Sequence, residues 1–196
     1  MANFKKNNTL ILASSSPRRQ TLLLEAHYSV IVQEPCDSAE DQHQRGELAE
    51  DFVQRQAIQK ANDVARQHSS GVILACDTIA CFQGAILGKP NDRGHAQQIL
   101  EKLRGHQHTV LTGICLWHRP SNRTIVRCVE TTLFFDNVSD KALQQYLDTN
   151  KWQGKAGAFG YQDGWDWLHI IHGSSSNVIG LPLEALAEML ADIATS

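Results

Sequence analysis

Short apolar runs rich in Val, Ile, Leu and Thr alternate along this chain with stretches in which apolar residues recur every three or four positions. The runs predict strands, and the spaced pattern predicts helices. Strands are expected over residues 9–13, 28–33, 71–82, 108–117, 124–135 and 167–171; helices over 17–27, 47–67, 92–105, from a cap at 139 through 147, and from 182 through 190. The intervening segments 33–46, 84–91 and 150–164 are expected to be loops. This alternation, followed by a hairpin around residues 118–122, predicts an α/β fold with a mixed β-sheet flanked by helices.

Chain length and cysteine content narrow the class of protein. A chain of 196 residues can bury its own core as one domain or as two small lobes around a cleft. Its five cysteines are an odd number without a Cys-x-x-Cys pair, so neither a disulfide framework nor a structural metal is expected, and we predict a cytoplasmic protein. The apolar run at residues 9–13 is too short for a secretory signal, and no stretch is long enough to span a membrane.

The net charge of the chain indicates what kind of ligand or partner the protein can bind. A formal net charge of -3 argues against a general nucleic-acid binder, which would carry a basic excess or stripe. A small anionic ligand held by a few clustered cations remains compatible with this composition.

Such cations follow the first predicted strand, in the segment Ser14-Ser15-Ser16-Pro17-Arg18-Arg19. Ser16 is a favourable N-cap, and proline suits the first helical position, where its missing N–H has no cost. Backbone amides at a helix N-terminus attract anions, and a guanidinium matches a phosphate edge bidentately. The segment therefore indicates an oligophosphate site, although Ser-Pro also opens many ordinary helices and paired arginines often lie on solvated faces.

A carboxylate interrupts the most apolar predicted strand, in Cys76-Asp77-Thr78. An aspartate in such a strand is costly to desolvate unless it is paired with a cation or with hydrogen-bond donors. It can hold a divalent cation or accept a proton from a water molecule near that cation. The alternative is a structural aspartate that caps a turn or a bulge, and the two interpretations stay open.

Three further charged residues are candidates. Lys89 lies between a glycine and a proline in Gly84–Pro90, which is one residue short of a nucleotide P-loop and has Pro90 where that motif needs Ser or Thr. A Walker site is therefore not expected, but Lys89 can still present one ammonium to a phosphate. Glu40, in an acidic loop, is a candidate metal ligand. Lys60, on a helix with an apolar face, can project into a cleft. Solvated surface positions are the alternative for all three.

Two late segments are rich in small residues. Residues 155–162 combine glycines, which let backbone approach a ligand closely, with Gln162, whose amide can donate and accept towards a uracil-like edge. Residues 173–183 form a second hydroxyl-rich turn that leads into a helix, as an anion site or as simple capping. Three tryptophans, at 152, 165 and 167, can stack on a base or pack in the core. The histidine pairs at 106/108 and 169/172 lack a third partner, which argues against zinc.

Five motifs in order along almost the whole chain are shared with one family. They are Ala13–Arg19, Cys76–Thr78, Gly88–Pro90, Gly157–Gln162 and Gly173–Leu183. Together they closely resemble the Maf family of nucleoside triphosphate pyrophosphatases. The resemblance implies a single Maf-like domain over residues 1–196, with a Maf/ITPase-like fold and two lobes around a deep cleft. It implies hydrolysis of a nucleoside triphosphate to the monophosphate and diphosphate, assisted by Mg²⁺ or Mn²⁺, and a homodimer is compatible with the family.

The same resemblance assigns roles by motif position. Asp77 would be the proton acceptor and a metal ligand, with Glu40 as a second ligand, although the family usually has Asp-Glu where this chain has Ala39-Glu40. Substrate binding would involve Ser14, Ser16, Arg18, Arg19, Lys60, Thr78, Lys89 and Gln162. Of these, the four cations would bind the phosphates. Arg18, Thr78 and Gln162 match the subgroup that acts on dTTP and UTP. Tyr161 stands where an aliphatic residue is frequent.

The sequence leaves two alternative functions open. One is a pyrophosphatase for 7-methyl-GTP or another modified nucleotide, whose subgroup differs at the base-associated positions. The other is a non-catalytic nucleotide-binding regulator of cell division, which would need the cations but not Asp77.

Overall fold

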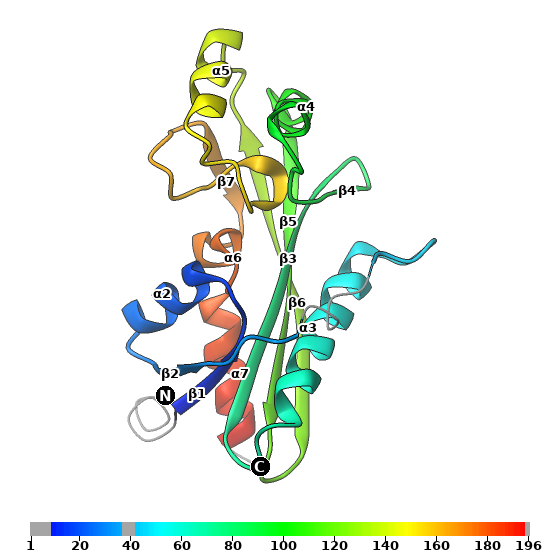
Figure 1. The fold of residues 1–196 in the computed structure, drawn as a ribbon, viewed down its shortest axis with the longest axis vertical. Coiled ribbons are helices and arrows are strands. Elements are labelled where there is room, and N and C mark those ends of the chain that lie inside the picture. Colours follow the sequence, from blue (N-terminus) through cyan, green and yellow to red (C-terminus); the bar gives the residue numbers. More distant parts are fainter. Residues whose placement is uncertain (1–8, 37–41, 195–196) are drawn as a thin grey trace. The chain divides into compact units, whose positions relative to one another are not determined.

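The computed structural model describes residues 9–36 and 42–194 (Figure 1). Its strands are β1 (Thr9–Ala13), β2 (Ser29–Val32), β3 (Val72–Phe82), β4 (Ala85–Leu87), β5 (Gln107–His118), β6 (Arg123–Phe135) and β7 (Leu168–His172). Its helices are α2 (Pro17–Glu25), α3 (Ala49–Ala65), α4 (Arg93–Leu103), α5 (Asp140–Asp148), α6 (Ser175–Ile179) and α7 (Leu183–Ala194), with a 3₁₀ turn, η2 (Ala156–Ala158).

The strands form one mixed sheet in the order β2-β1-β3-β5-β6-β7, with β4 paired to β3. Strand β1 is parallel to both β2 and β3, whereas β4 is antiparallel to β3 and β7 is antiparallel to β6. The predicted α/β fold with a mixed sheet flanked by helices is therefore confirmed. The register Ala13↔Ala75 aligns the end of β1 with the middle of β3.

The prediction missed three short elements. Strand β4 and the turn η2 lie in segments expected to be loops, and α6 lies in the predicted hydroxyl-rich turn. Each has five residues or fewer, which is too short for a periodic pattern, and β4 depends on its pairing with β3. Helix α2 ends at Glu25, two residues before the predicted end, because His27 adopts a left-handed backbone with φ 62°.

The contacts of the chain divide it into two compact units. The described residues of the first unit fall within Met1–Asp77, Thr112–Val129 and Gly180–Ser196, and the second unit comprises Thr78–Leu111 and Glu130–Ile179. The single domain and the cleft expected from the sequence stay predictions.

In the first unit, α3 packs on one face of β1, β3 and β5. Small residues on the helix, such as Ala57 and Ala61, contact Ile11 and Ile73, which are partners in the parallel register. Figure 1 shows α2 and α7 on the other side of these strands. The helix approaches β5 so closely that a Cβ at Gly113 would lie 2.1 Å from the carbonyl oxygen of Val53. Glycine is required there to bring α3 against the sheet.

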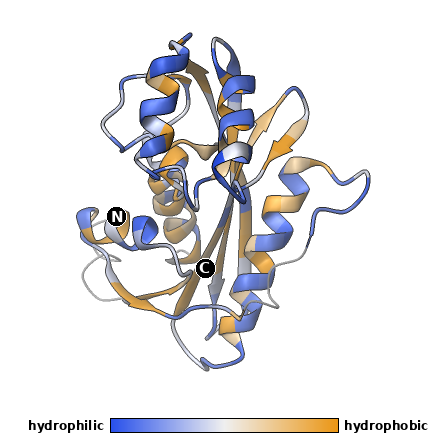
Figure 2. Ribbon diagram, turned by 45° about the horizontal axis from the view of Figure 1, so that its top comes forward, coloured by the Kyte–Doolittle hydropathy of each residue, from blue (hydrophilic) through white to orange (hydrophobic). Residues whose placement is uncertain are grey.

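In the second unit, α4 and α5 enclose a core rich in aromatic side chains. Tyr146 and Phe135 are fully buried, and Phe159 stacks on Trp167 with a centroid distance of 5.9 Å. The side chains of Trp152, Trp165 and Trp167 all belong to this cluster, and the Trp152 indole donates to the carbonyl of Leu147. Of the two roles considered for these tryptophans, the structure shows core packing. In Figure 2 the strands are largely hydrophobic, whereas the helices carry both hydrophobic and hydrophilic residues.

Candidate active site

The turn after β1 is organised by the buried hydroxyl of Ser14. Because β1 and β3 are parallel and Ala13 pairs with Ala75, this turn begins beside residues 76 and 77 of β3. The Ser14 Oγ accepts a hydrogen bond from the backbone N–H of Ser16 at 3.1 Å and another from Nη1 of Arg19 at 3.1 Å. Nε of Arg19 donates to the carbonyl of Gly180 at 2.8 Å. The guanidinium is thus fixed from two sides.

The predicted helix start is confirmed, with one difference in its capping. Ser16 is the N-cap of α2 and Pro17 occupies the first turn, but the Ser16 hydroxyl makes no capping hydrogen bond. The side chain of Ser14 receives the Ser16 amide instead, because Ser14 lies inside the turn and is only 4% exposed. Arg18 is half-buried in the first turn of α2. The sequence could not assign the serine that orders the turn, since all three have the same side chain.

A buried ion pair joins α3 to β3. Nζ of Lys60 lies 2.7 Å from Oδ1 of Asp77, and the two side chains are 6% and 18% exposed. Lys60 is on the sheet-facing side of α3, one helical turn from Ala57 and next to Ala61. A solvated lysine was the alternative, and the structure excludes it. Asp77 falls where the fully buried run of β3 is interrupted, so its carboxylate is paired but still accessible.

Cys76 adjoins Asp77 on β3 and lies next to the start of the turn, one residue beyond the Ala13↔Ala75 pair. Burial raises the pKa of Cys76 to about 12, while the charges of Arg19 and Lys60 act to lower it and that of Asp77 acts to raise it. The turn after β1 and the Lys60–Asp77 pair therefore lie on neighbouring strands, at the same level of the sheet. Within the first unit, the structure joins Ser14 to Arg19 and Lys60 to Asp77.

Three of the predicted substrate residues belong to the second unit: Thr78, Lys89 and Gln162. Thr78 is half-buried, and strand alternation sends its side chain to the opposite face of β3 from that of Asp77. Lys89 is exposed and follows β4, ahead of a buried Pro90. Because α4 begins only at Arg93, Lys89 does not open a helix, which agrees with the absence of a Walker arrangement. Gln162 is exposed in the loop formed by residues 155–163, which contains η2.

Sequence reasoning missed a polar cluster that closes this loop. Lys155 and Asp163, at its two ends, form an ion pair whose side chains are 11% and 10% exposed. The hydroxyl of Tyr146 lies 3.3 Å from Oδ2 of Asp163 and 3.2 Å from the carbonyl oxygen of Ala158. Burial raises the pKa of Tyr146 well above its usual value, so the phenol is a donor. No sequence pattern marks this cluster, since its members come from α5 and from both ends of the loop.

The second hydroxyl-rich turn has a structural role. The backbone N–H of Asn177 donates to Oγ of Ser174, which caps the short helix α6. The Asn177 side chain donates to Oγ1 of Thr131 at 2.9 Å and to the carbonyl of Val110 at 3.3 Å. These bonds tie the turn to β5 and β6, so of the two interpretations considered the structure supports capping.

Glu40, the second predicted metal ligand, lies outside the described residues. Among residues 9–36 and 42–194, no three His, Cys, Asp or Glu side chains come together as a metal-binding group. In the same part of the chain, every helix is too short or too polar to cross a membrane.

Known proteins resemble this chain over almost its full length. The family model described as "Maf-like protein" matches residues 9–193. A dTTP/UTP pyrophosphatase from Rhodopirellula baltica is 49% identical over 183 residues, covering 93% of this chain and 81% of the relative. The protein of the same name from Latilactobacillus sakei is 40% identical, covering 92% and 98%, and that from Desulfotalea psychrophila is 39% identical, covering 95% of each.

Among solved structures, a HAM1 protein from Coxiella burnetii matches with a TM-score of 0.47 and 16% identity, covering 67% of this chain and 74% of that one. The family model covers all five motifs and both compact units. The chain therefore belongs to the Maf-like protein family.

Proposed function

We infer that this protein is a nucleoside triphosphate pyrophosphatase that hydrolyses dTTP and UTP to the monophosphate and diphosphate. The name dTTP/UTP pyrophosphatase, carried by relatives up to 49% identical, supports this inference. The observation that carries it is the buried Lys60–Asp77 pair beside the turn that fixes Arg19. An isolated structural aspartate would not need a buried lysine paired with it and a neighbouring turn that fixes an arginine.

Phosphate binding follows from the charges. A triphosphate carries about four negative charges at neutral pH, and phosphoryl transfer depends chiefly on positioning and on charge neutralisation. The Arg19 guanidinium is held by Ser14 and by the carbonyl of Gly180, so it loses little conformational freedom when it binds a phosphate. We propose that Arg18, Arg19 and Lys60 bind the polyphosphate, and the family resemblance adds Lys89.

Asp77 is suited to accept the proton of the attacking water. Its carboxylate is oriented by Lys60 at 2.7 Å and remains partly accessible. In the proposed step, the oxygen of water forms a bond to phosphorus while one proton of that water passes to the carboxylate of Asp77, and the α,β-phosphoanhydride bond breaks as the other product leaves. Asp77 then releases this proton, which returns the carboxylate to its starting form. Lys60 would keep this carboxylate oriented before the substrate arrives.

A divalent cation is compatible with this chemistry. Mg²⁺ is commonly held by one or two carboxylates together with substrate phosphates and water, so Asp77 alone among the described residues is a sufficient protein anchor. Glu40 is the second proposed ligand. A bound Mg²⁺ or Mn²⁺ would neutralise charge on the phosphate oxygens.

The base and the cell compartment are further parts of the proposal. Gln162 can donate to and accept from the edge of uracil or thymine, and the resemblance associates Arg18 and Thr78 with the same preference. All five cysteines are free thiols, which supports a reducing, cytoplasmic environment. A homodimer remains a proposal from the family.

One assay tests the reaction. Purified protein is incubated with Mg²⁺ or Mn²⁺ and with UTP, dTTP, GTP, 7-methyl-GTP and CTP, and pyrophosphate is measured against orthophosphate. We expect pyrophosphate, fastest from UTP and dTTP. Fastest release from 7-methyl-GTP would contradict the pyrimidine preference, and binding without release from any nucleotide would indicate a regulator.

Two variants test the proposed roles. Asp77→Asn is expected to abolish turnover while nucleotide binding stays measurable; Asp140→Asn, whose carboxylate is 88% exposed, is the matched control and should retain wild-type turnover. Wild-type turnover in Asp77→Asn would remove Asp77 from the mechanism. Gln162→Ala is expected to lower the ratio of UTP to GTP turnover and to retain part of the activity. An unchanged ratio would refute its role in base selection.

A further inference from the structure

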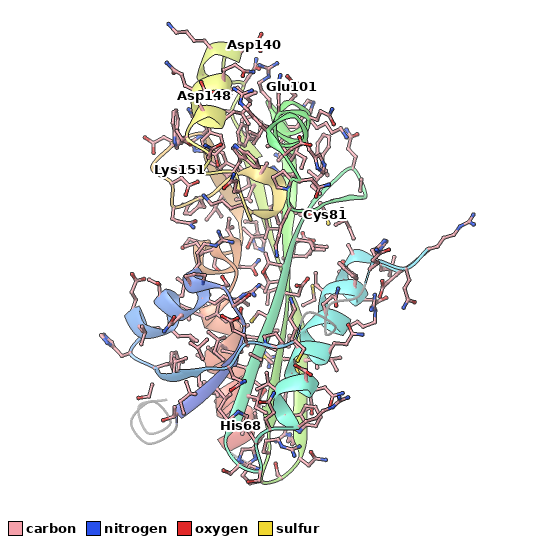
Figure 3. The ribbon with its side chains drawn as sticks, in the orientation of Figure 1. His68, Cys81, Glu101, Asp140, Asp148 and Lys151 are labelled. Carbon is pink, nitrogen blue, oxygen red and sulfur yellow. The ribbon has the colours of Figure 1, made fainter. Side chains whose placement is uncertain are left out.

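The loop that carries Gln162 is closed by a clasp, which we define as Lys155, Asp163 and Tyr146. Lys155 and Asp163 stand at the two ends of the loop, and each is about nine-tenths buried in its side chain. The backbone N–H of Asp163 also donates to the carbonyl of Gly160 at 3.0 Å. Nζ of Lys151, labelled in Figure 3 below α5, donates to the carbonyl of Asp163 at 3.2 Å. The end of the loop next to Gln162 is therefore held through both side chain and backbone.

The backbone between the two ends is shaped to fit this clasp. Gly157 has φ 68° and Ala158 has φ 58°, two successive left-handed residues. An added Cβ at Gly160 would lie 2.5 Å from Oδ2 of Asp163 and 2.6 Å from Nζ of Lys155, so the ion pair sits directly over the glycine. The left-handed alanine is strained by itself and persists only where its surroundings fix it.

The clasp is also anchored in the core. The Tyr146 ring is fully buried and packs on Phe159 with a centroid distance of 4.8 Å, while its hydroxyl reaches both Asp163 and the carbonyl of Ala158. Removing one partner of a buried ion pair leaves an uncompensated charge, which is strongly unfavourable. Opening of the loop would lower this cost, because the remaining charge would then be hydrated.

We propose that this clasp is a positioning device for nucleobase selection: Lys155 and Asp163, steadied by Tyr146, hold residues 159–162 in the conformation that presents Gln162 to the base. This rests on the proposed function. The residues are positioning residues, because the clasp is turned towards the core and Gln162, next to Asp163, is the exposed group. Loosening the clasp should weaken recognition of the correct base more than it slows the chemical step.

The test compares Asp163→Asn and Lys155→Met with Asp166→Asn. The control removes an exposed carboxylate three residues beyond the end of this loop and before β7. We expect each clasp variant to raise KM for UTP at least fivefold, to keep kcat within about threefold, and to lower the UTP to GTP ratio of kcat/KM at least fivefold. Asp166→Asn should match the wild type. An unchanged ratio, or a fall in kcat alone, would overturn the proposal.

Tyr146→Phe is the milder variant, and it keeps the ring in the core. It should lower the UTP to GTP ratio in the same direction by a smaller factor, about twofold, and so tests the proposal even if a charge variant fails to fold. The double variant Lys155→Met with Asp163→Asn should lose no more selectivity than the worse single variant, because either substitution alone already breaks the same ion pair. Additive losses would show that the two residues act separately and would refute the clasp.

Limited chymotrypsin digestion separates this proposal from the proposed function. Phe159 is buried and Tyr161 is half-buried in the intact loop, so the folded wild type should be cleaved slowly there. Cleavage after these residues should become at least tenfold faster in Asp163→Asn, and it should not change in Asp166→Asn. If the wild type hydrolyses no nucleotide, the proposed function fails while this readout still applies. Unchanged cleavage in Asp163→Asn would then overturn the clasp.

Discussion

Replacing Gly113 by alanine should destabilise the protein strongly, because the added methyl group would meet backbone. The new Cβ would lie 2.1 Å from the carbonyl oxygen of Val53 and 2.7 Å from the backbone nitrogen of Gln54. Ordinary van der Waals contact begins at 3.4 Å, so α3 or β5 must move by more than 1 Å. Overpacking typically costs about 1–3 kcal/mol. Two backbone segments cannot yield by rotating a side chain, and we therefore expect about 3 kcal/mol or more.

Urea unfolding followed by tryptophan fluorescence measures this loss. The midpoint should fall with little change in slope, and a melting temperature lowered by about 6–12 °C is expected for a chain of this length. Gly88→Ala is the control, since a Cβ there has nothing within 4 Å, and its unfolding free energy should stay within about 0.5 kcal/mol of wild type. Adding Val53→Ala should not restore stability, because the contact is with the carbonyl. A Gly113→Ala protein as stable as the control would refute the reasoning.

Two other predictions concern Lys60 and His108. Lys60→Met should lower kcat/KM at least a hundredfold, because the Asp77 carboxylate loses the cation 2.7 Å away and the phosphates lose a partner. Steady-state kinetics check this, and turnover within twofold of wild type would contradict it. Burial lowers the pKa of His108 to about 4, below its usual 6.5, so the unfolded chain takes up this proton first. The associated stability is present above pH 6.5 and falls by about 3 kcal/mol as the pH drops to 4. In His108→Gln, the urea midpoint should fall less between pH 6.5 and pH 4 than it does in the wild type. An equal fall in the two proteins would contradict the assignment.

The sequence predicted the long elements well because their patterns are local. The helix cap at Asp92 accepts from the backbone of His95, and that at Ser139 accepts from Ala142, as expected from residue type and position. Strand β4 has only three residues and depends on its partner strand, so no local pattern announces it. For this reason the sequence predicts a loop around Lys89 and does not predict the strand that precedes it.

The candidate site was predicted in its residue types but not in its contacts. The motifs marked Arg19 and Asp77. The helical pattern around Lys60 made it a candidate for a cleft, with a solvated surface position as the alternative. Only the parallel pairing of β1 with β3 and the packing of α3 place the turn next to this part of β3 and Lys60 against Asp77. Which serine organises the turn depends on burial within the turn, and that is a property of the folded chain.

The sequence by itself determined the fold class and the family and named the residues of the candidate site, because periodicity, capping and motifs are properties of neighbouring residues. The tertiary structure alone decided that Lys60 is buried against Asp77, that Gly113 must lack a side chain, and that Lys155 and Asp163 close a loop over Gly160. Each of these depends on distances between segments far apart in the chain, or between the two ends of a loop. Such distances are set by packing, and no local pattern of residues encodes them.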